Sequence, residues 1–325
     1  MAIRKTILRL IGFVLLGVLL AKIDKGQFLG VLGKAALPLV IAAIALNIPG
    51  ILIKSLRWRW LLSAQGISYG ITPSTLAYFG SIFIGLLTPG RLGEFVKALH
   101  VSKDCGVSSG RAFSSVLADR LFDLYALAIV GGVALINLGT FSTQILVAIL
   151  GLMALVLVLP LVLLLNSRTF AWGQTLGARM GKIGRKLLGP EGWLVELREG
   201  LKALSPSWTL LGVALTVLAY GVFYLQAYLL AVALHLDASI LVVSYAVALG
   251  SLITLIPISI SGIGTREAGI VAYLGAHGVS AEAALGFSLL VFATFYLGTA
   301  GIGAVAWIIK PVDIARGTGH VSEKG

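Results

Sequence analysis

The sequence from Leu124 to Ser167 reads LYALAIVGGVALINLGTFSTQILVAILGLMALVLVLPLVLLLNS and contains no charged residue. A helix that crosses a membrane needs about 20 predominantly apolar residues, so this stretch is long enough for two crossings. A polar break, Asn137–Gln144, lies within it. We therefore predict two membrane-spanning helices joined as a hairpin at this break.

The composition of the whole chain agrees with a membrane protein. Of its 325 residues 58% are hydrophobic and 12% are charged, and the mean hydropathy is +1.01. Soluble globular proteins are about 25% charged, so this composition excludes a soluble domain and a disordered chain. The single cysteine, Cys105, excludes an internal disulfide. The net charge is +12, but its cations lie between apolar segments, as expected for loops beside anionic headgroups, and we expect no nucleic-acid partner.

Four further segments are predicted to cross the membrane: one before Leu20, then Ala35–Ile53, Leu204–Leu236 and Ala283–Ile309. Cytoplasmic loops are enriched in Lys and Arg. The loop Arg168–Lys202 carries seven Lys or Arg and three Glu, so we place it in the cytoplasm. By the same rule we place both termini and the cations at 54–59 in the cytoplasm.

Two long uncharged stretches are interrupted by glycine and proline. The first, Trp60–Gly90, ends in Thr88-Pro89-Gly90, and the second, Ala238–Thr265, ends in a break from Pro257 to Gly264. A broken helix in hydrocarbon is tolerated only where protein or a cavity surrounds it. The charge count makes the chain from Ile71 to His100 start and finish inside, and Ala238–Gly278 start and finish outside. We predict two re-entrant hairpins that enter from opposite faces.

A short motif recurs after each break: Gly106-Val107-Ser108 follows the first and Gly278-Val279-Ser280 the second. With the opposite orientations, this predicts an inverted repeat, an architecture of secondary transporters. The predicted fold is an all-α polytopic membrane protein with about six full transmembrane helices and two re-entrant broken-helix hairpins. It forms a single integral membrane domain, 1–325, with repeat one at about 35–137, repeat two at about 204–309 and a cytoplasmic amphipathic linker at 168–204.

Ionisable side chains inside a membrane are costly and mark substrate or ion pathways, and guanidinium groups suit phosphate. The candidate substrate-binding residues are Arg91, Glu94, Lys97, Asp119, Arg120, Asp123, Arg266 and Glu267. The alternative is that these charges only pair with one another, and for Lys97 that it extends to the membrane surface. We find no catalytic signature and no metal-ligand spacing, and expect no catalytic residue, metal or cofactor.

The motifs Thr88-Pro89-Gly90-Arg91-Leu92-Gly93-Glu94, Ala118-Asp119-Arg120 and Gly262-Ile263-Gly264-Thr265-Arg266-Glu267 resemble those of the lysylphosphatidylglycerol synthase transmembrane (flippase-like) family. The resemblance covers nearly the whole chain and implies lipid handling. Bifunctional members carry an aminoacyl-transferase domain after this region. The chain ends at Gly325 without such a domain, so we expect a stand-alone membrane domain without synthase activity.

We expect a flippase or transporter that moves an anionic or zwitterionic lipid, phospho- or polyprenyl-linked, between the leaflets of a prokaryotic cell (inner or plasma) membrane. Two alternatives stay open. One is a membrane-embedded transferase acting on a polyprenyl-phosphate lipid. The other is a non-catalytic scaffold for an envelope-lipid enzyme bound at the cytoplasmic face. The expected partners are a membrane lipid substrate and, for the scaffold alternative, a lipid-modifying enzyme at the cytoplasmic face.

Overall fold

The computed structural model describes most of the chain as helices, and the described part contains no β-strand. The described residues are 14–139, 142–179, 181, 187–189, 192–203, 206–255 and 262–312. The all-α fold is therefore confirmed. The break at Pro257–Ser261 and both ends of the chain, on which several predictions rest, lie outside the described residues.

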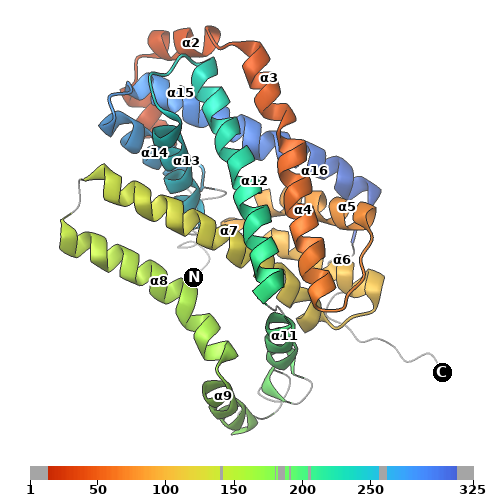
Figure 1. The fold of residues 1–325 in the computed structure, drawn as a ribbon. Coiled ribbons are helices and arrows are strands. Elements are labelled where there is room, and N and C mark those ends of the chain that lie inside the picture. Colours follow the sequence, from red (N-terminus) through yellow and green to blue (C-terminus); the bar gives the residue numbers. More distant parts are fainter. Residues whose placement is uncertain are drawn as a thin grey trace.

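The elements, in chain order, are α2 (Lys25–Gly33), α3 (Leu37–Ala45), α4 (Asn47–Ala64), α5 (Ile71–Leu86), the 3₁₀ helix η1 (Pro89–Phe95), α6 (Val96–Cys105), α7 (Ser109–Leu138), α8 (Thr143–Leu165), α9 (Ser167–Arg179), α11 (Trp193–Lys202), α12 (Pro206–Ala233), α13 (Ile240–Leu255), α14 (Thr265–Ala276), α15 (Ala281–Val291), the π-helix η3 (Phe292–Leu297) and α16 (Gly298–Ile309). Figure 1 shows their arrangement.

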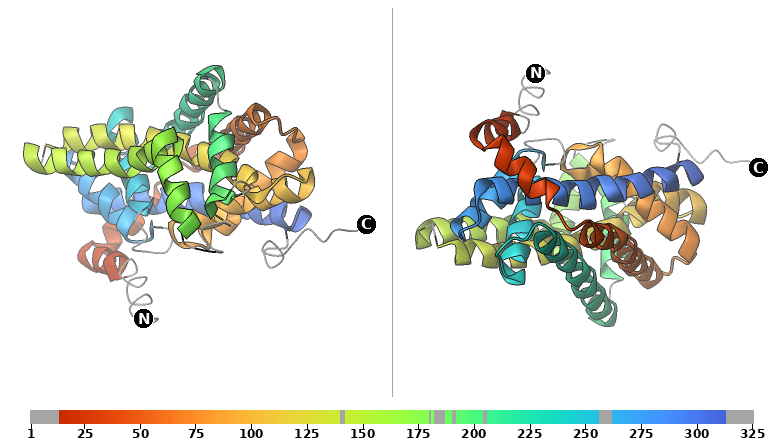
Figure 2. Two further views of the ribbon diagram at one scale, coloured as in Figure 1. Left: turned by 90° about the horizontal axis from the view of Figure 1, so that it is seen from below. Right: turned by 90° about the horizontal axis from the view of Figure 1, so that it is seen from above.

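Five described helical segments are long and apolar enough to cross a membrane: Leu37–Ala64, Ser109–Leu138, Thr143–Leu165, Thr209–Ala233 and Ala281–Ile309. They match five of the six predicted crossings, and the multi-pass membrane fold is confirmed. The sixth predicted crossing lies near the N-terminus, where only its second half, residues 14–22, is described and helical. The last crossing, α15 through η3 to α16, is one continuous rod across the molecule (Figure 2).

The stretch with no charge forms the predicted hairpin. Helices α7 and α8 lie near one another where α7 ends and α8 begins, and they diverge away from there (Figure 1). Gly139 takes the left-handed conformation, with φ 63°, that ends many helices. No residue of α8 is fully buried, and most of its apolar side chains face the surroundings, while Leu161 and Leu164 pack against the core formed with α7 and α11. A helix of this kind is stable in lipid and not in water.

Each predicted broken region is a pair of short helices. Helix α5 is followed by η1 and α6, and α13 is followed, after an undescribed gap, by α14. Both α5 and α13 have 16 residues. At 1.5 Å per residue each reaches about 24 Å, less than the roughly 30 Å of a bilayer's hydrocarbon core. Within each pair the helices pack against one another.

The two halves of the chain repeat the same order of elements. Six residues separate α4 from α5, and six separate α12 from α13. Ser108 and Ser280 cap the next long helix with nearly the same backbone angles, φ −60°, ψ 150° and φ −61°, ψ 152°. Packing between the halves is reciprocal: α5 of the first packs on α16 of the second, and α13 of the second packs on α7 of the first.

Two predictions about boundaries are wrong. The helix predicted to end at Ile53 continues to Ala64, and Arg57, expected in an exposed loop after it, is completely buried within the protein. It can be buried because carboxylates on α7 meet it, as described below. In the linker, α11 does not lie on lipid with its apolar side: Leu197 and Leu201 pack into a core formed with α7. The apolar side of α11 therefore packs against protein and not against lipid.

An ion pair connects the C-terminal end of α6 to the residue that follows α16. The Lys310 ammonium lies 2.7 Å from Asp104 Oδ2, and the Tyr69 hydroxyl donates to the same oxygen at 2.6 Å. Burial alone would raise the pKa of the Asp104 carboxyl, but the hydrogen bonds from Lys310 and Tyr69 prevail and hold that pKa below its usual value.

We expect Asp104→Asn to lower the free energy of unfolding at neutral pH by up to about 1 kcal/mol, the value of a partly exposed ion pair. A lowered carboxyl pKa stabilises the fold above the unfolded pKa of about 3.9, and the gain is lost as the pH falls through the folded pKa. Thermal unfolding of both proteins in detergent from pH 7 to pH 3 should therefore show a difference that is constant at neutral pH and shrinks as the pH falls below about 4. A difference that is constant with pH would contradict this account.

Candidate functional site

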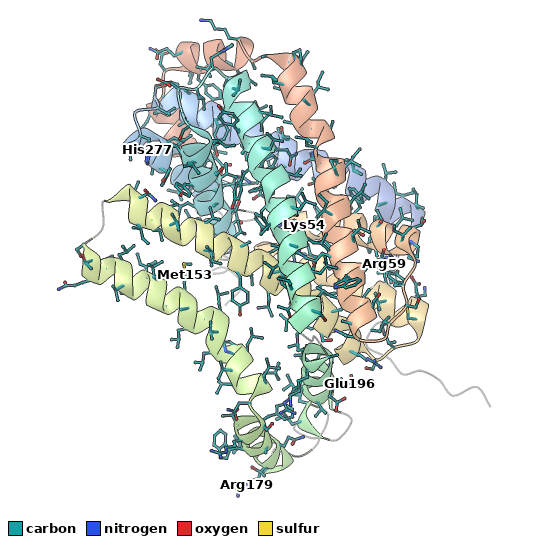
Figure 3. The ribbon with its side chains drawn as sticks, in the orientation of Figure 1. Lys54, Arg59, Met153, Arg179, Glu196 and His277 are labelled. Atoms are coloured by element: carbon teal, nitrogen blue, oxygen red, sulfur yellow. The ribbon has the colours of Figure 1, made fainter. Side chains whose placement is uncertain are left out.

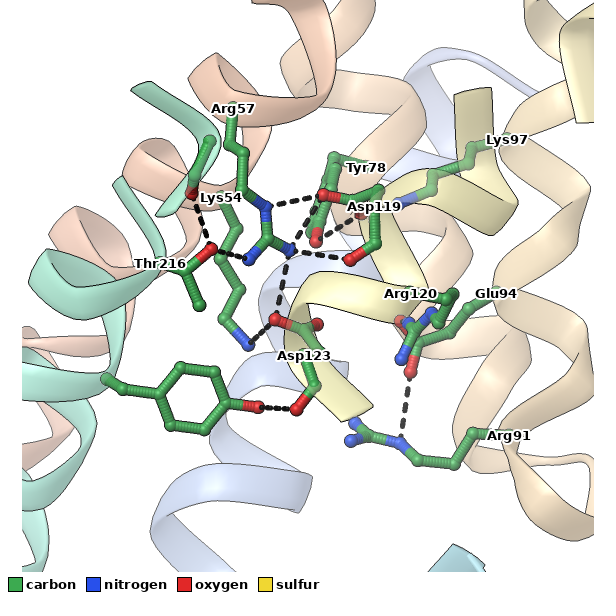
Figure 4. Close-up of polar contacts among 12 residues, drawn as sticks. Lys54, Arg57, Tyr78, Arg91, Glu94, Lys97, Asp119, Arg120, Asp123 and Thr216 are labelled. Carbon is green, nitrogen blue, oxygen red and sulfur yellow. Dashed lines mark hydrogen bonds and ion pairs between the residues drawn. The ribbon is translucent and has the colours of Figure 1, made fainter. Parts of the chain in front are cut away.

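A buried ion network joins α4 to α7 (Figure 4). Asp119 and Asp123 lie one turn apart on α7 and face α4. The Arg57 guanidinium donates from Nε to Asp119 Oδ1 at 2.8 Å and from Nη2 to Asp123 Oδ1 at 2.9 Å. Its Nη1 donates to Thr216 Oγ1 of α12 at 2.8 Å. The side chains of Arg57 and Asp119 have no exposed surface, so three long helices are held together by one guanidinium.

Two lysines complete this network. Lys54 Nζ lies 3.3 Å from Asp123 Oδ1, and Lys97 Nζ lies 2.5 Å from Asp119 Oδ2. The ammonium of Lys97 also lies 3.8 Å from the centre of the Tyr78 ring. Lys97 is completely buried, so the alternative that it extends to the membrane surface is wrong. The carboxylate of Asp119, close by in the fold, holds it inside.

Sequence reasoning missed Lys54 and Arg57 as site residues because it interpreted them as the cytoplasmic flank of a crossing. Their spacing offered a signal. Two cations three residues apart share one face of a helix. Asp119 and Asp123, four apart, do the same on α7. Matching charged faces on two apolar helices indicate that the helices pair, but the pairing joins residues 62 and 66 positions apart and needs the fold to reveal it.

A second network lies at the break after α5. Glu94, 3% exposed in its side chain, pairs with Arg120 of α7, and its Oε1 lies 3.0 Å from Arg91 Nε without hydrogen-bond geometry. Arg91 has φ 59°, a left-handed conformation that a residue with a side chain adopts at some cost. The Thr88 hydroxyl, which accepts from the Gly93 N–H at 2.7 Å, holds the turn.

Glycines explain the local sequence of this break. A Cβ at Gly93 would meet the Ile84 carbonyl of α5, and a Cβ at Gly85 would meet the Glu94 side chain. Only glycine at both positions lets η1 lie directly on the end of α5. This close packing directs Glu94 toward Arg120 on α7. The two glycines therefore determine where the Glu94 carboxylate lies.

The third pair, on α14, is self-contained. Arg266 and Glu267 form an ion pair, and both are 1% exposed. Glu267 Oε2 also accepts from the Gly264 N–H at 2.5 Å and so caps α14. The Arg266 guanidinium lies 4.5 Å from the centre of the Tyr296 ring, and that of Arg91 lies 5.2 Å from the same ring. The two breaks therefore meet at one aromatic ring, in the π-helix η3.

A cavity of about 250 Å³, the polar cavity, lies between the two halves. Its charged lining residues are Lys54, Arg91, Glu94, Arg120 and Asp123, and its aromatic lining residues include Tyr78, Tyr220, Phe223, Phe295 and Tyr296. Four of the eight predicted site residues thus face one space. Lys97 and Asp119 lie behind its wall, and Arg266 and Glu267 reach it only through Tyr296.

The polar cavity lies beside the middle of a candidate membrane crossing. Asp123 is close to the middle of α7, a helix of 30 residues and a candidate crossing. Two guanidinium donors of the lining residues have no hydrogen-bond acceptor among the described residues: Nε of Arg91 and Nε of Arg120. Buried donors without acceptors are costly, so these groups are available to a ligand.

The comparisons with known proteins agree with this architecture. The family described as the lysylphosphatidylglycerol synthase TM region matches residues 6–303. The chain belongs to this family. A relative along nearly the full length is a UPF0104 membrane protein of Methanothermobacter thermautotrophicus, 24% identical over 331 residues, which is 94% of this chain and 96% of that protein.

Two further relatives of this family member match over shorter stretches. A UPF0104 membrane protein of Pyrococcus horikoshii is 28% identical over 163 residues, 49% of each chain. The glycosyltransferase AglD of Haloferax volcanii is 31% identical over 116 residues, 36% of this chain and 19% of that protein. The matched stretch thus spans about half of the first protein's length and a fifth of the second's.

We expect Arg57→Leu to destabilise the protein by about 3–5 kcal/mol, because it leaves two buried carboxylates without their main partner. Arg59→Leu, on the exposed side of the same helix, is the matched control and should cost about 1 kcal/mol or less. Figure 3 labels Arg59 and Lys54 on this helix. Thermal unfolding and folded yield in detergent measure both variants. Equal stability of the two would show that the network does not hold α4 to α7.

Proposed function

We propose that this protein is a transporter that moves an anionic lipid between the leaflets of a prokaryotic cell membrane, without catalysing a reaction on it. One observation carries the proposal: five ionisable side chains line a single cavity at membrane depth between the two halves of the chain. Charged groups inside a membrane usually mark the path of a substrate or an ion. Here the lipid headgroup would occupy the polar cavity.

The proposal interprets the two halves, 35–137 and 204–309, as an inverted repeat. The short pairs α5–α6 and α13–α14 would then be re-entrant hairpins from opposite faces, with both termini in the cytoplasm. The equal six-residue spacings and the reciprocal packing of α5 on α16 and α13 on α7 support this interpretation. Transporters built this way bind their substrate where the broken helices meet. In this protein Arg91 and Arg266 meet at Tyr296.

An apolar groove gives the hydrocarbon part of the lipid a place. The groove, of about 490 Å³, lies between α7, α8 and α12 and has no charged lining residue. Two of its lining residues contact the ion network: Thr216 accepts a hydrogen bond from Arg57, and the Phe122 ring centre lies 5.7 Å from the Arg57 guanidinium. A polar cavity and an apolar groove that share the wall around Arg57 suit an amphiphile.

The similarity to the glycosyltransferase AglD supports a second candidate function, a membrane-embedded transferase acting on a polyprenyl-phosphate lipid. The two functions are distinguished by assay. Purified protein with labelled sugar donors and polyprenyl-phosphate lipid should form no product if the protein only transports. Product formation by the purified chain would favour a transferase.

The test of transport is Arg91→Gly. Glycine adopts a positive φ without strain, so this variant removes the guanidinium and relieves the backbone at the same position. In proteoliposomes that contain a fluorescent phosphatidylglycerol, we expect its flipping rate to fall at least about tenfold, the effect of losing roughly 1.4 kcal/mol of headgroup binding. Reduction of the outer-leaflet fluorophore by dithionite measures the rate.

Arg59→Ala, outside the polar cavity, is the control and should flip lipid like the wild type. Folded yield of Arg91→Gly should equal that of the wild type. If Arg91→Gly also flips lipid at the wild-type rate, the headgroup does not pass Arg91 and the assigned site is wrong.

A further inference from the structure

The charges around the polar cavity do not balance. Ten ionisable side chains belong to the three ion-paired groups described above. The six cations are Lys54, Arg57, Arg91, Lys97, Arg120 and Arg266, and the four carboxylates are Glu94, Asp119, Asp123 and Glu267. Two positive charges are left over. The undescribed break at 256–261 contains no charged residue and cannot correct the difference.

The surplus is divided between two groups. The Arg57 network holds three cations and two carboxylates, and the Glu94 network holds two cations and one carboxylate. The pair on α14 is balanced. Each unbalanced network turns a cation toward the polar cavity, Lys54 from the first and Arg91 with Arg120 from the second. The lining itself carries three cations and two carboxylates, so one surplus charge lies on the lining of the polar cavity. The other lies directly behind its wall, among Arg57, Lys97 and Asp119.

The cations that line the polar cavity also have more N–H donors without an acceptor than the cations behind its wall. Lys54 has one carboxylate neighbour at 3.3 Å, which leaves donors of its ammonium free, and its nitrogen lies 4.7 Å from the centre of the Tyr220 ring. Arg91 and Arg120 each keep an Nε without an acceptor among the described residues. Arg57 and Lys97, by contrast, are fully buried behind the wall and occupied with Asp119.

An unbalanced cation at membrane depth costs several kcal/mol unless an anion meets it. We infer that the headgroup bound in the polar cavity carries two negative charges, as a lipid ending in a phosphomonoester does. A phosphodiester carries one negative charge, and a zwitterionic headgroup carries no net charge. This inference rests on the proposed function and narrows it to a substrate class.

The experiment compares three lipids with the same acyl chains: phosphatidic acid, phosphatidylglycerol and phosphatidylcholine. Each competes with a fluorescent phosphatidic acid for the purified protein in detergent micelles. We expect phosphatidic acid to bind at least tenfold more tightly than phosphatidylglycerol at pH 7.5. The preference should shrink at pH 5, because the second pKa of a phosphomonoester is about 6.

Lys54→Met tests the charge count directly. It removes one of the two surplus charges and leaves Asp123 paired with Arg57, so the fold should persist. We expect phosphatidic acid and phosphatidylglycerol to bind this variant within about threefold of one another, while Lys54→Arg restores the wild-type preference. Lys103→Met, an exposed lysine on α6, is the control and should behave as the wild type.

The outcomes separate the inference from the proposed function. If both anionic lipids bind the wild type equally and better than phosphatidylcholine, the site takes an anionic lipid but not specifically a dianion, and the inference is wrong. If no anionic lipid is preferred over phosphatidylcholine, the proposed function fails as well. Inorganic phosphate at the same concentration should not compete. Displacement by phosphate would assign the site to a free anion and overturn the lipid assignment.

Discussion

Two carboxylates in the middle of a membrane-spanning helix constrain everything around them. Asp119 and Asp123 cannot be placed in hydrocarbon at an acceptable cost unless cations meet them there. Arg57 supplies most of that compensation, with hydrogen bonds at 2.8 Å and 2.9 Å. Because the same guanidinium reaches Thr216, helices α4, α7 and α12 are fixed by one charge. The wall of the polar cavity follows from this arrangement.

The two halves have the same order of helices but differ in the charged residues that these helices carry. In the proposed repeat, counting from equivalent helix ends, the positions of Lys54 and Arg57 in α4 correspond to Phe223 and Gln226 in α12. The position of Asp123 in α7 corresponds to Phe295. One wall of the polar cavity is therefore charged and the opposite wall aromatic. Such a space suits a ligand that is ionic on one side and apolar on the other.

The break between α5 and α6 shows how glycine placement serves this chemistry. Close approach of η1 to α5 turns Glu94 inward, where Arg120 and Arg91 meet it. The left-handed backbone at Arg91 is a local cost of the same turn. In the second half the corresponding carboxylate, Glu267, is used as a helix cap and as the partner of its neighbour. The difference in charge between the two halves is therefore already present at the two breaks, whose local backbone geometry differs.

The sequence alone determined the membrane as solvent, the hairpin of α7 and α8, the two interrupted segments and eight candidate charges, because hydropathy and glycine or proline breaks are local properties. Only the tertiary structure decided which charges meet. It brought Lys54 and Arg57 into the site, buried Lys97 and left Arg266 paired with Glu267. A cation at a helix end and a cation paired across helices look alike in sequence, since the partner carboxylate lies dozens of residues away.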